Sequence, residues 1–200
     1  MQILGIDTST PVLSVAVVEG DVALASLESG ELTGAQLHGE ILATLVKEIL
    51  EHHKIDVVAV GLGPGPYTGL RTGIAFAQAV AYARDIKIVG VSSLFALAHG
   101  YWQRGGASGV AVLDAKRKEI AWQEFDDTSL FGEPNLTNIN DISVLQGKTI
   151  VGPAFVTQPS DLITVLDATP PHAKDVAMLA HKGFGQPITP LYLRTPDVTH

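Results

Sequence analysis

Asp7 is the acidic residue best placed for a chemical role, because it ends the apolar run Gln2–Asp7 and precedes the hydroxyl side chains of Thr8 and Ser9. A short apolar run of this kind is typical of a buried strand, so Asp7 is expected at the carboxyl end of that strand. A carboxylate there could face a nucleotide and its metal ion, which makes Asp7, Thr8 and Ser9 a candidate weak nucleotide site. The alternative is that these side chains only hydrogen-bond the turn.

The spacing of the histidines does not predict a metal site. A helical zinc pair needs two histidines four positions apart, with a glutamate as the base, as in H-E-x-x-H. His38 and Glu40 are two positions apart and His52 and His53 are adjacent, so the members of each pair point to different faces of a helix. The chain also has no cysteine and no G-x-S-x-G nucleophile motif. We therefore predict no metal, no cofactor and no catalytic residue.

A glycine-rich stretch, Gly61–Gly73, is the most distinctive motif and holds five glycines and two prolines. It lies between the apolar runs 57–60 and 70–83, where a strand must turn sharply into a helix. Free N–H groups at such a helix N-terminus favour an anion or a closely packed partner. The stretch lacks the lysine of a P-loop, and Thr68 stands where the dinucleotide motif needs its third glycine. We expect a structural or partner-facing loop, with ligand contact as the alternative.

The net charge of −8 argues against tight nucleic-acid binding by this chain alone, because neutralised phosphates supply most of that affinity. The densest basic cluster is Lys116-Arg117-Lys118, which we interpret as a solvated hairpin turn. Contact with nucleic-acid phosphates inside a larger assembly is the alternative. Only 17% of the residues are charged and 46% are apolar, which indicates either an extensive protein interface or a well-filled core.

Apolar periodicity and turn residues predict the elements that must position these side chains. In the first half they are strands at Gln2–Asp7, Leu13–Val18 and Val22–Leu27, a helix over Thr33–His53, strand Asp56–Gly61, a helix over Leu70–Ala83, strand Ile86–Val91 and a helix over Leu94–Tyr101 capped by Ser92. In the second half they are strands Val110–Asp114 and Glu119–Phe125, a polar surface loop over Asp127–Asn140, strand Thr149–Gly152, a helix over His172–Gly183 and an extended piece at Pro190–Arg194.

The order of these elements predicts the fold class. Three strands in a meander, followed by helix–strand crossovers, give a mixed sheet with helices on both faces. This is the order of a ribonuclease-H-like half of the actin, Hsp70 and sugar-kinase fold. We therefore predict an α/β protein of two lobes, the first over 1–103 with the glycine-rich loop and the second, smaller one over 104–200. Asp7 and Asp114 each end a leading strand, which suggests an internal duplication with a truncated second copy.

The predicted helix over Thr33–His53 has an unusually wide apolar face. One row repeats every four residues at Leu37, Ile41, Leu45 and Ile49, and an adjacent row holds Leu42, Val46 and Leu50. This face is broader than one sheet contact requires. Either a helix of another subunit covers the remainder, or the predicted helix over Leu70–Ala83 does.

Several of these motifs together resemble the bacterial TsaB (YeaZ) family, a relative of the glycoprotease group. The resemblance spans nearly the whole chain and is strongest in the glycine-rich signature. It rests on Ile3–Thr10 with Ser14–Val17, on Gly63–Gly73, on Val91–Leu94, on Leu113–Ala115 and on Pro190–Arg194, in that order. The signature residues are Gly63, Pro64, Gly65, Tyr67, Thr68, Gly69, Arg71 and Gly73, and Pro66-Tyr67 replaces the usual Ser-Phe.

The resemblance implies a two-lobed actin/Hsp70-like fold and a subunit of the machinery that makes threonylcarbamoyladenosine beside the anticodon of tRNA. It also implies a subunit that dimerises with itself or with the catalytic paralogue TsaD, that is joined by the ATPase TsaE and that reaches tRNA only through the complex. The paralogue's H-x-x-x-H metal motif is missing, because Leu42 stands four places after His38 and Asp56 four places after His52. The implied role is a non-catalytic dimerisation and scaffold subunit. The alternative is a glycoprotease-type metal-dependent peptidase or an ATP-using enzyme of the same superfold.

The family's partner interface is formed by the two helices of the first lobe. Carried over to this chain, the resemblance places it at Leu37, Ile41, Leu42, Leu45, Ile74 and Gln78. The N-terminus has no basic region before an apolar run, and no apolar stretch approaches the length of a membrane span. We therefore expect a cytoplasmic protein without membrane contact.

Overall fold

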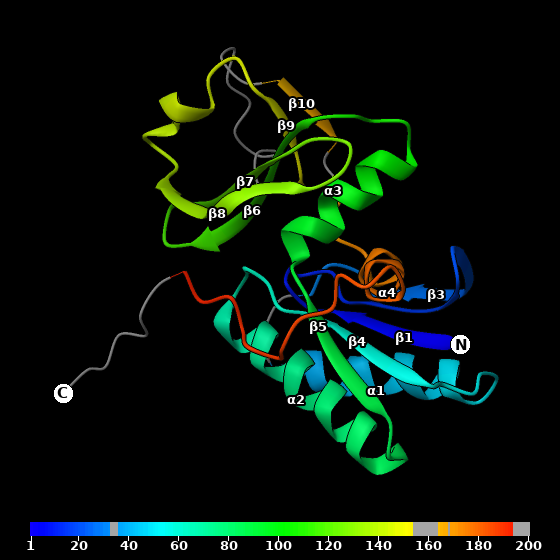
Figure 1. The fold of residues 1–200 in the computed structure, drawn as a ribbon. Helices are drawn as coiled ribbons and strands as arrows, with labels where there is room; N and C mark the ends of the chain where they lie inside the picture. The colour runs from blue at the N-terminus through cyan, green and yellow to red at the C-terminus, as the bar shows by residue number, and fades with distance from the viewer. Residues whose placement is uncertain (33–35, 154–163, 168, 194–200) are drawn as a thin grey trace.

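The chain folds around two five-stranded sheets, one in each half of the sequence. The structure is a computed structural model and describes residues 1–32, 36–153, 164–167 and 169–193. In Figure 1 the first sheet lies in the lower part of the molecule and the second sheet in the upper part. No helix among the described residues is long and apolar enough to span a membrane.

The first sheet is the predicted meander extended by parallel strands. Its members are β1 (Gln2–Asp7), β2 (Ser14–Glu19), β3 (Val22–Glu28), β4 (Val57–Gly61) and β5 (Lys87–Val91), in the order β3-β2-β1-β4-β5. Strands β1, β2 and β3 pair antiparallel, whereas β4 pairs parallel with both β1 and β5. This mixed sheet confirms the ribonuclease-H-like order that the sequence predicts.

The second sheet has the same connectivity. Its members are β6 (Gly109–Lys116), β7 (Glu119–Phe125), β8 (Leu130–Asn138), β9 (Thr149–Val151) and β10 (Thr164–Asp167), in the order β8-β7-β6-β9-β10. The first three are again an antiparallel meander, and β9 pairs parallel with β6 and β10. The repeated order fits the internal duplication suggested by Asp7 and Asp114. A short 3-10 helix, η1 (Ile142–Leu145), lies where the first half has its long helix.

Three helices cover the two faces of the first sheet. Helices α1 (Gln36–Leu50) and α2 (Tyr67–Arg84) pack side by side on one face, and α4 (Ala173–His181) packs on the other. Alternation along the strands explains this arrangement, because successive side chains point to opposite faces. Thus Leu4 and Ile6 contact the α1–α2 core, and Ile3 contacts the core beneath α4.

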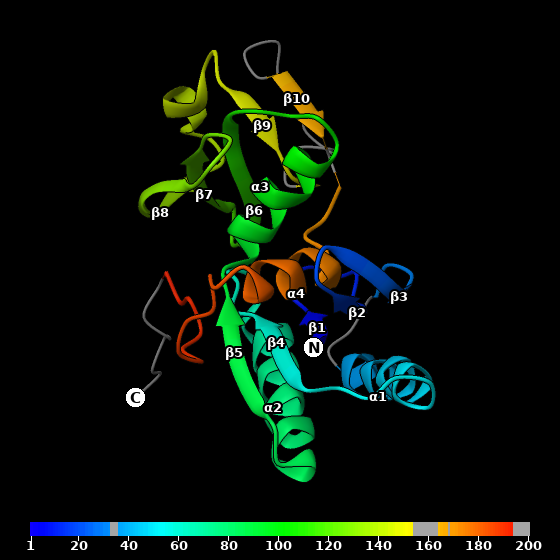
Figure 2. The ribbon, with the colours of Figure 1, turned by 45° about the vertical axis from the view of Figure 1, so that its right-hand side comes forward.

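Two helices pack on the sheet of the other half of the chain, across the predicted boundary between residues 103 and 104. Helix α3 (Ser93–Gln103) packs against β6, β7 and β9 of the second sheet, although it belongs to the first half of the sequence. Helix α4 comes from the second half and packs on the first sheet and on α3. Figure 2 shows α4 lying between the two sheets. The result is an α/β fold of two mixed sheets flanked by helices, in which the helices bind the two halves together.

The segment 127–140 is a strand for most of its length, so the prediction of a surface loop was wrong there. Strand β8 pairs with β7 and forms the edge of the second sheet. An edge strand tolerates the polar residues and Pro134, because one side of its backbone needs no partner. Gly132 has a positive φ of 60°, and the pairing register shifts near it. The polar composition gave no sign of a strand here, because β8 forms through its pairing with β7.

Helix α2 begins three residues earlier than predicted, at Tyr67 rather than Leu70. Pro66 occupies the N-cap with φ −57°, which suits the entry into a helix. The second half of the signature, Tyr67–Gly73, therefore lies inside α2. The other predicted helices agree within a few residues, and Ser92 caps α3 by accepting a hydrogen bond from the Phe95 N–H.

Candidate functional site

Asp7 joins the carboxyl end of β1 to the glycine-rich loop and to α3. Its carboxylate is fully buried, with 0% exposure. Oδ1 accepts hydrogen bonds from the N–H and the hydroxyl of Ser9, at 2.9 and 2.6 Å. Oδ2 accepts one from the Ser93 hydroxyl at 2.7 Å. The same Ser93 oxygen accepts a hydrogen bond from the N–H of Gly63 at 3.1 Å, so one carboxylate organises two separate segments.

Burial and hydrogen bonding act on Asp7 in opposite directions. Burial raises the pKa of this carboxyl above its ordinary value, and the hydrogen bonds from Ser9 and Ser93 oppose the rise. Each of these donors stabilises the carboxylate form without adding a charge. The balance leaves Asp7 more easily protonated than an exposed aspartate.

The glycines of the signature are explained by close packing against the turn that follows β1. A Cβ atom at Gly61 would lie 2.0 Å from Asp7 Oδ2, and one at Gly73 would lie 2.1 Å from Thr8 Oγ1. The Thr8 hydroxyl also donates a hydrogen bond to the carbonyl of Gly69, at 2.9 Å. These contacts support the structural interpretation of the motif, because a side chain at Gly61 or Gly73 would push the turn after β1 away from β4 or from α2.

The candidate nucleotide site at Asp7, Thr8 and Ser9 is closed. All three residues are buried, and their side-chain hydrogen bonds are made within the chain. A phosphate or its cation would reach the carboxylate only after Ser9 and Ser93 had moved. The site therefore stays a prediction from sequence, and the hydrogen-bonded turn describes what the residues do in this structure.

The segment at residues 190–193 contacts the same motif at both Leu62 and Arg71. Leu191 donates its N–H to the Leu62 carbonyl at 2.9 Å. The Arg71 guanidinium lies 3.8 Å from the centroid of the Tyr67 ring, and Arg71 Nε donates a hydrogen bond to the Tyr192 hydroxyl at 3.1 Å. The Tyr67 and Tyr192 rings are 5.0 Å apart. The structure thus brings the signature and the predicted piece at 190–194 together; Arg194 itself lies outside the described residues.

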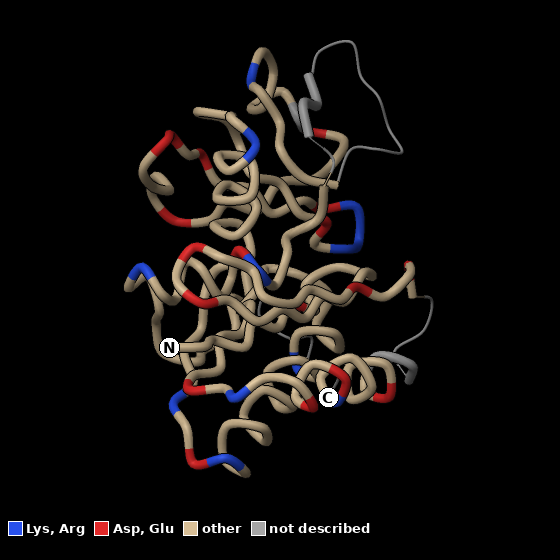
Figure 3. Tube along the Cα trace, turned by 90° about the vertical axis from the view of Figure 1, so that its right-hand side faces the viewer, with Lys and Arg blue, Asp and Glu red and all other residues tan. Residues whose placement is uncertain are grey.

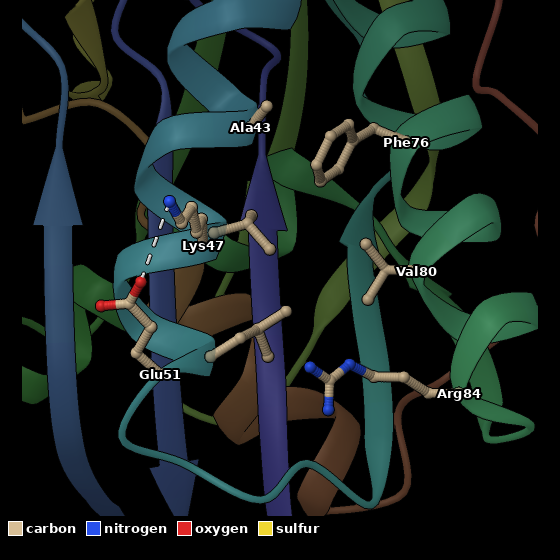
Figure 4. A pocket seen from close by; sticks show the side chains of 8 residues that line it. Ala43, Lys47, Glu51, Phe76, Val80 and Arg84 are labelled. Atoms are coloured by element: carbon tan, nitrogen blue, oxygen red, sulfur yellow. Dashed lines mark ion pairs between the residues drawn. The ribbon is translucent and has the colours of Figure 1, made fainter.

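An open groove of about 370 Å³ lies between α1 and α2 on the outer surface of the first half. Its walls are mostly apolar and its rim is charged. The lining residues are Ala43, Val46, Lys47 and Leu50 of α1, Glu51 directly after it, and Phe76, Val80 and Arg84 of α2. Figure 4 shows Phe76, Val80 and Arg84 pointing from α2 towards α1. Lys47 and Glu51 form an i,i+4 ion pair at 4.0 Å along the opposite rim.

The residues predicted for the partner interface occupy three different environments. Leu42 and Ile74 are buried in the core between the helices and the first sheet, so their side chains are covered within one chain. Ile41 and Leu45 are half-buried against that core, and Gln78 is exposed. Leu37 belongs to α1, but its side chain lies outside what the structure describes. Ile41, Leu45 and Gln78 therefore keep accessible surface, but none of the three lines the groove.

None of the residues predicted for the interface lines the groove, although Val46 and Leu50 belong to the apolar rows noted in the sequence. The signal was present in the spacing of Phe76, Val80 and Arg84, which repeats every four positions along α2 and places them on one stripe. The predicted interface residues of α1 belong to its apolar rows, and these rows also contain the residues that face the core. Core residues and groove residues share the same periodicity, so they are distinguished only by burial. Burial depends on where the sheet lies under the helix.

The histidines that the structure describes lie apart from any cluster of metal-ligand side chains. Among the described residues no group of three or more His, Cys, Asp and Glu side chains could hold a metal ion. His99 is instead buried on α3, with its Nδ1 2.8 Å from Asp175 Oδ1 of α4. This pair joins the two helices that link the halves. The spacing in the sequence could not identify Asp175 as the partner of His99.

Two ribonuclease-H-like sheets with the same strand order, joined by helices, define the actin and sugar-kinase class of fold. Among solved structures, YeaZ from Pseudomonas aeruginosa superposes with a TM-score of 0.80 at 26% identity, covering 96% of this chain and 99% of that chain. The whole architecture, including the reduced second half, is therefore shared with YeaZ.

Sequence comparisons give the family. The family model described as TsaD, tRNA N6-adenosine threonylcarbamoyltransferase, matches residues 33–153. An uncharacterized protein of Mycobacterium tuberculosis is 32% identical over 98% of this chain and 92% of its own length. The tRNA threonylcarbamoyladenosine biosynthesis protein TsaB of Escherichia coli is 35% identical over 62% of this chain and 55% of its own length. The chain belongs to the TsaB/YeaZ family.

Proposed function

We propose that this chain is a non-catalytic subunit of the tRNA threonylcarbamoyladenosine machinery and acts by binding the transferase TsaD. The names of its TsaB relatives and the match to the TsaD family model support the pathway. Proteins that share a fold often associate through equivalent surfaces, so a TsaD-like partner suits a chain that resembles TsaD itself.

The observation that carries the proposal is the apolar groove between α1 and α2. Val46, Leu50, Phe76 and Val80 supply its apolar walls. Lys47, Glu51 and Arg84 place both signs of charge at its rim. An apolar centre with a charged rim is the usual anatomy of a specific protein interface. A stable partner typically buries on the order of 2,000 Å² or more, so the groove would form the centre of a larger contact.

The closed surroundings of Asp7 support a role without catalysis by this chain. An acid or metal-binding carboxylate must reach its substrate, whereas the Asp7 oxygens are held by Ser9 and Ser93. In the proposed assembly the transferase supplies the chemistry and TsaE joins the pair. Without TsaD, a second copy of this chain would cover the same groove, so homodimer and heterodimer would compete.

Co-purification with TsaD tests the proposal with one pair of matched variants. Ala43 is exposed and lines the groove, so Ala43→Arg fills the groove without disturbing a buried side chain. Ala107 is an exposed alanine before β6, and Ala107→Arg makes the same change far from the groove. We expect Ala43→Arg to lose TsaD and Ala107→Arg to retain it.

Circular dichroism and thermal unfolding of both variants establish that they remain folded. Ile41→Asp is a less clean probe, because Ile41 packs against the core and its loss affects folding as well as docking. Retention of TsaD by a folded Ala43→Arg protein at wild-type yield would refute docking at the groove.

A further inference from the structure

Helix α2 exposes a second surface besides its wall of the groove. Arg71, Gln78 and Tyr82 follow one another at intervals of seven and four residues, which places them on one stripe of the helix. All three are exposed, and Tyr82 is 90% exposed, more than any other large apolar side chain that the structure describes. These three residues form the outer flank of α2. Tyrosine and arginine are among the side chains most enriched where binding energy concentrates at protein interfaces.

The outer flank faces away from α1. Figure 4 shows Phe76 and Val80 pointing from α2 towards α1. Gln78 and Tyr82 each follow one of these residues by two positions, which is a rotation of roughly 200° around a helix. Helix α1 contacts β2 and β3, whereas α2 contacts β4 and β5. The outer flank therefore lies towards the β5 edge of the first sheet.

The exposed surface of α2 is continuous from the groove to the outer flank. Ala75, Ala79 and Ala83 are exposed and lie between the two, and their short side chains let a partner approach the helix closely. Eight residues line the groove, whereas a stable interface uses about 20–30 residues on each partner. A partner seated in the groove must therefore contact more of this surface, and the outer flank is its direct continuation.

Two tyrosines hold Arg71 in one orientation. Its guanidinium carbon lies 3.8 Å from the centroid of the Tyr67 ring, and its Nε donates a hydrogen bond to the Tyr192 hydroxyl at 3.1 Å. The two tyrosine rings pack against each other, with centroids 5.0 Å apart. A planar guanidinium binds a carboxylate through two parallel hydrogen bonds. A side chain that is fixed before binding loses less conformational entropy when the partner arrives.

The charge of α2 contrasts with that of the whole chain. The chain has 21 acidic and 13 basic residues, and Figure 3 shows acidic positions in both halves of the molecule. Helix α2 has two arginines and no acidic residue. Within the part of the chain that the structure describes, no carboxylate pairs with Arg71, whereas Lys148 and Lys182 each pair with one. The Arg71 charge is thus available to a carboxylate of another molecule.

We propose that the outer flank of α2 belongs to the docking surface for TsaD, with an acidic side chain of TsaD bound to Arg71 and an apolar contact over Tyr82. The choice of TsaD rests on the proposed function. A protein carboxylate suits this site better than the phosphates of a nucleic acid, because the net charge of −8 opposes a polyanion. Tyr192 is then a positioning residue, because it acts on the partner through Arg71.

Isothermal titration of TsaD into the full chain at several salt concentrations tests the proposal. Arg71→Gln removes the charge, so the dissociation constant should rise about 10- to 100-fold and should depend less on salt. Tyr82→Ala should weaken binding about 10-fold or more with the salt dependence of the wild type. Lys118→Gln removes an exposed charge from the second sheet and serves as the control, with wild-type affinity.

Two further variants separate a fixed guanidinium from a mere positive charge. Arg71→Lys keeps the charge but loses the planar fork, so most of the Arg71→Gln loss should remain. Tyr192→Phe keeps the ring and removes the hydroxyl that holds Nε, so the dissociation constant should rise about 2- to 10-fold. In the Arg71→Gln background Tyr192→Phe should cause no further loss. An equal loss in both backgrounds would overturn the positioning role of Tyr192.

The wild-type titration distinguishes failure of this proposal from failure of the proposed function. Circular dichroism and thermal unfolding establish that each variant is folded. Wild-type affinity of folded Arg71→Gln and Tyr82→Ala proteins would overturn the outer flank as a docking surface and leave the groove in place. Unchanged TsaD affinity with weaker tRNA binding by the Arg71→Gln complex would also overturn it, because Arg71 would then contact phosphate. A wild-type chain that does not bind TsaD would refute both proposals.

Discussion

The Ser93 hydroxyl donates a 2.7 Å hydrogen bond to Asp7 Oδ2, across 86 residues of sequence. It joins the carboxyl end of β1 to the first residue of α3. Because α3 packs on the second sheet, the contact also links the two halves of the molecule. The signature loop enters the same network through the Gly63 N–H. Asp7, which suggests a nucleotide site in the sequence, therefore lies in the structure where β1, the signature loop and α3 meet.

Removal of the Ser93 hydroxyl should destabilise the protein. Ser93→Ala leaves one buried carboxylate oxygen without its donor and the Gly63 N–H without its acceptor. We expect a decrease of about 1–3 kcal/mol in the free energy of unfolding, measured by urea denaturation. Ser108→Ala removes an exposed serine and serves as the control. Equal midpoints for the two variants would show that the network contributes nothing.

The stability of the protein should depend on pH through Asp7. Its folded-state pKa is raised above the ordinary value of 3.8 by burial. The native state therefore holds this proton more tightly than the unfolded chain, and the stability it gives is present below pH 3.8 and lost as pH rises through the folded-state pKa. Asp7→Asn cannot titrate, so its unfolding free energy should lack this decline. A wild-type and a variant profile of the same shape would contradict the account.

His172 should give a pH dependence of the opposite sign. Its ring accepts a hydrogen bond from the Lys174 N–H as the N-cap of α4 and lies 2.7 Å from Glu28 Oε1. Burial lowers the pKa of His172 below 6.5, against the pull of Glu28. The contribution to stability is present above pH 6.5 and is lost as pH falls through the folded-state pKa.

The variant His172→Asn isolates this histidine, because asparagine also caps a helix but does not titrate. Its unfolding free energy should change less than that of the wild type between about pH 7 and pH 5. The comparison uses urea denaturation at each pH. An unchanged slope would mean that another group controls this range.

Two glycine substitutions should have opposite effects. Gly61→Ala places a methyl group 2.0 Å from Asp7 Oδ2 and should cost about 1–3 kcal/mol or more through overpacking. Gly39→Ala lies within α1, where the nearest atom to the new methyl group is Thr72 Cγ2 at 4.0 Å. It should stabilise the helix by up to about 1 kcal/mol. Thermal unfolding of both variants checks the pair, and a stabilised Gly61→Ala protein would disprove the packing argument.

The sequence predicted the architecture of the first half almost completely, because each element is marked by its own periodicity and its own turn residues. It failed where pairing or burial decides the outcome. Strand β8 has a polar sequence and exists through its hydrogen bonds to β7. Leu42 and Leu50 belong to one apolar row, yet Leu42 is buried in the core and Leu50 lines the groove. Only the position of the sheet under α1 distinguishes them.

Hydrogen–deuterium exchange of the chain with and without TsaD tests the central claim most directly. The account predicts that binding slows exchange in peptides from α1 and α2, around Ala43–Glu51 and Phe76–Arg84, which form the groove. Peptides from β7 and β8 in the second sheet should exchange at the same rate in both states. Protection confined to the second sheet, with unchanged exchange in α1 and α2, would contradict docking at the groove.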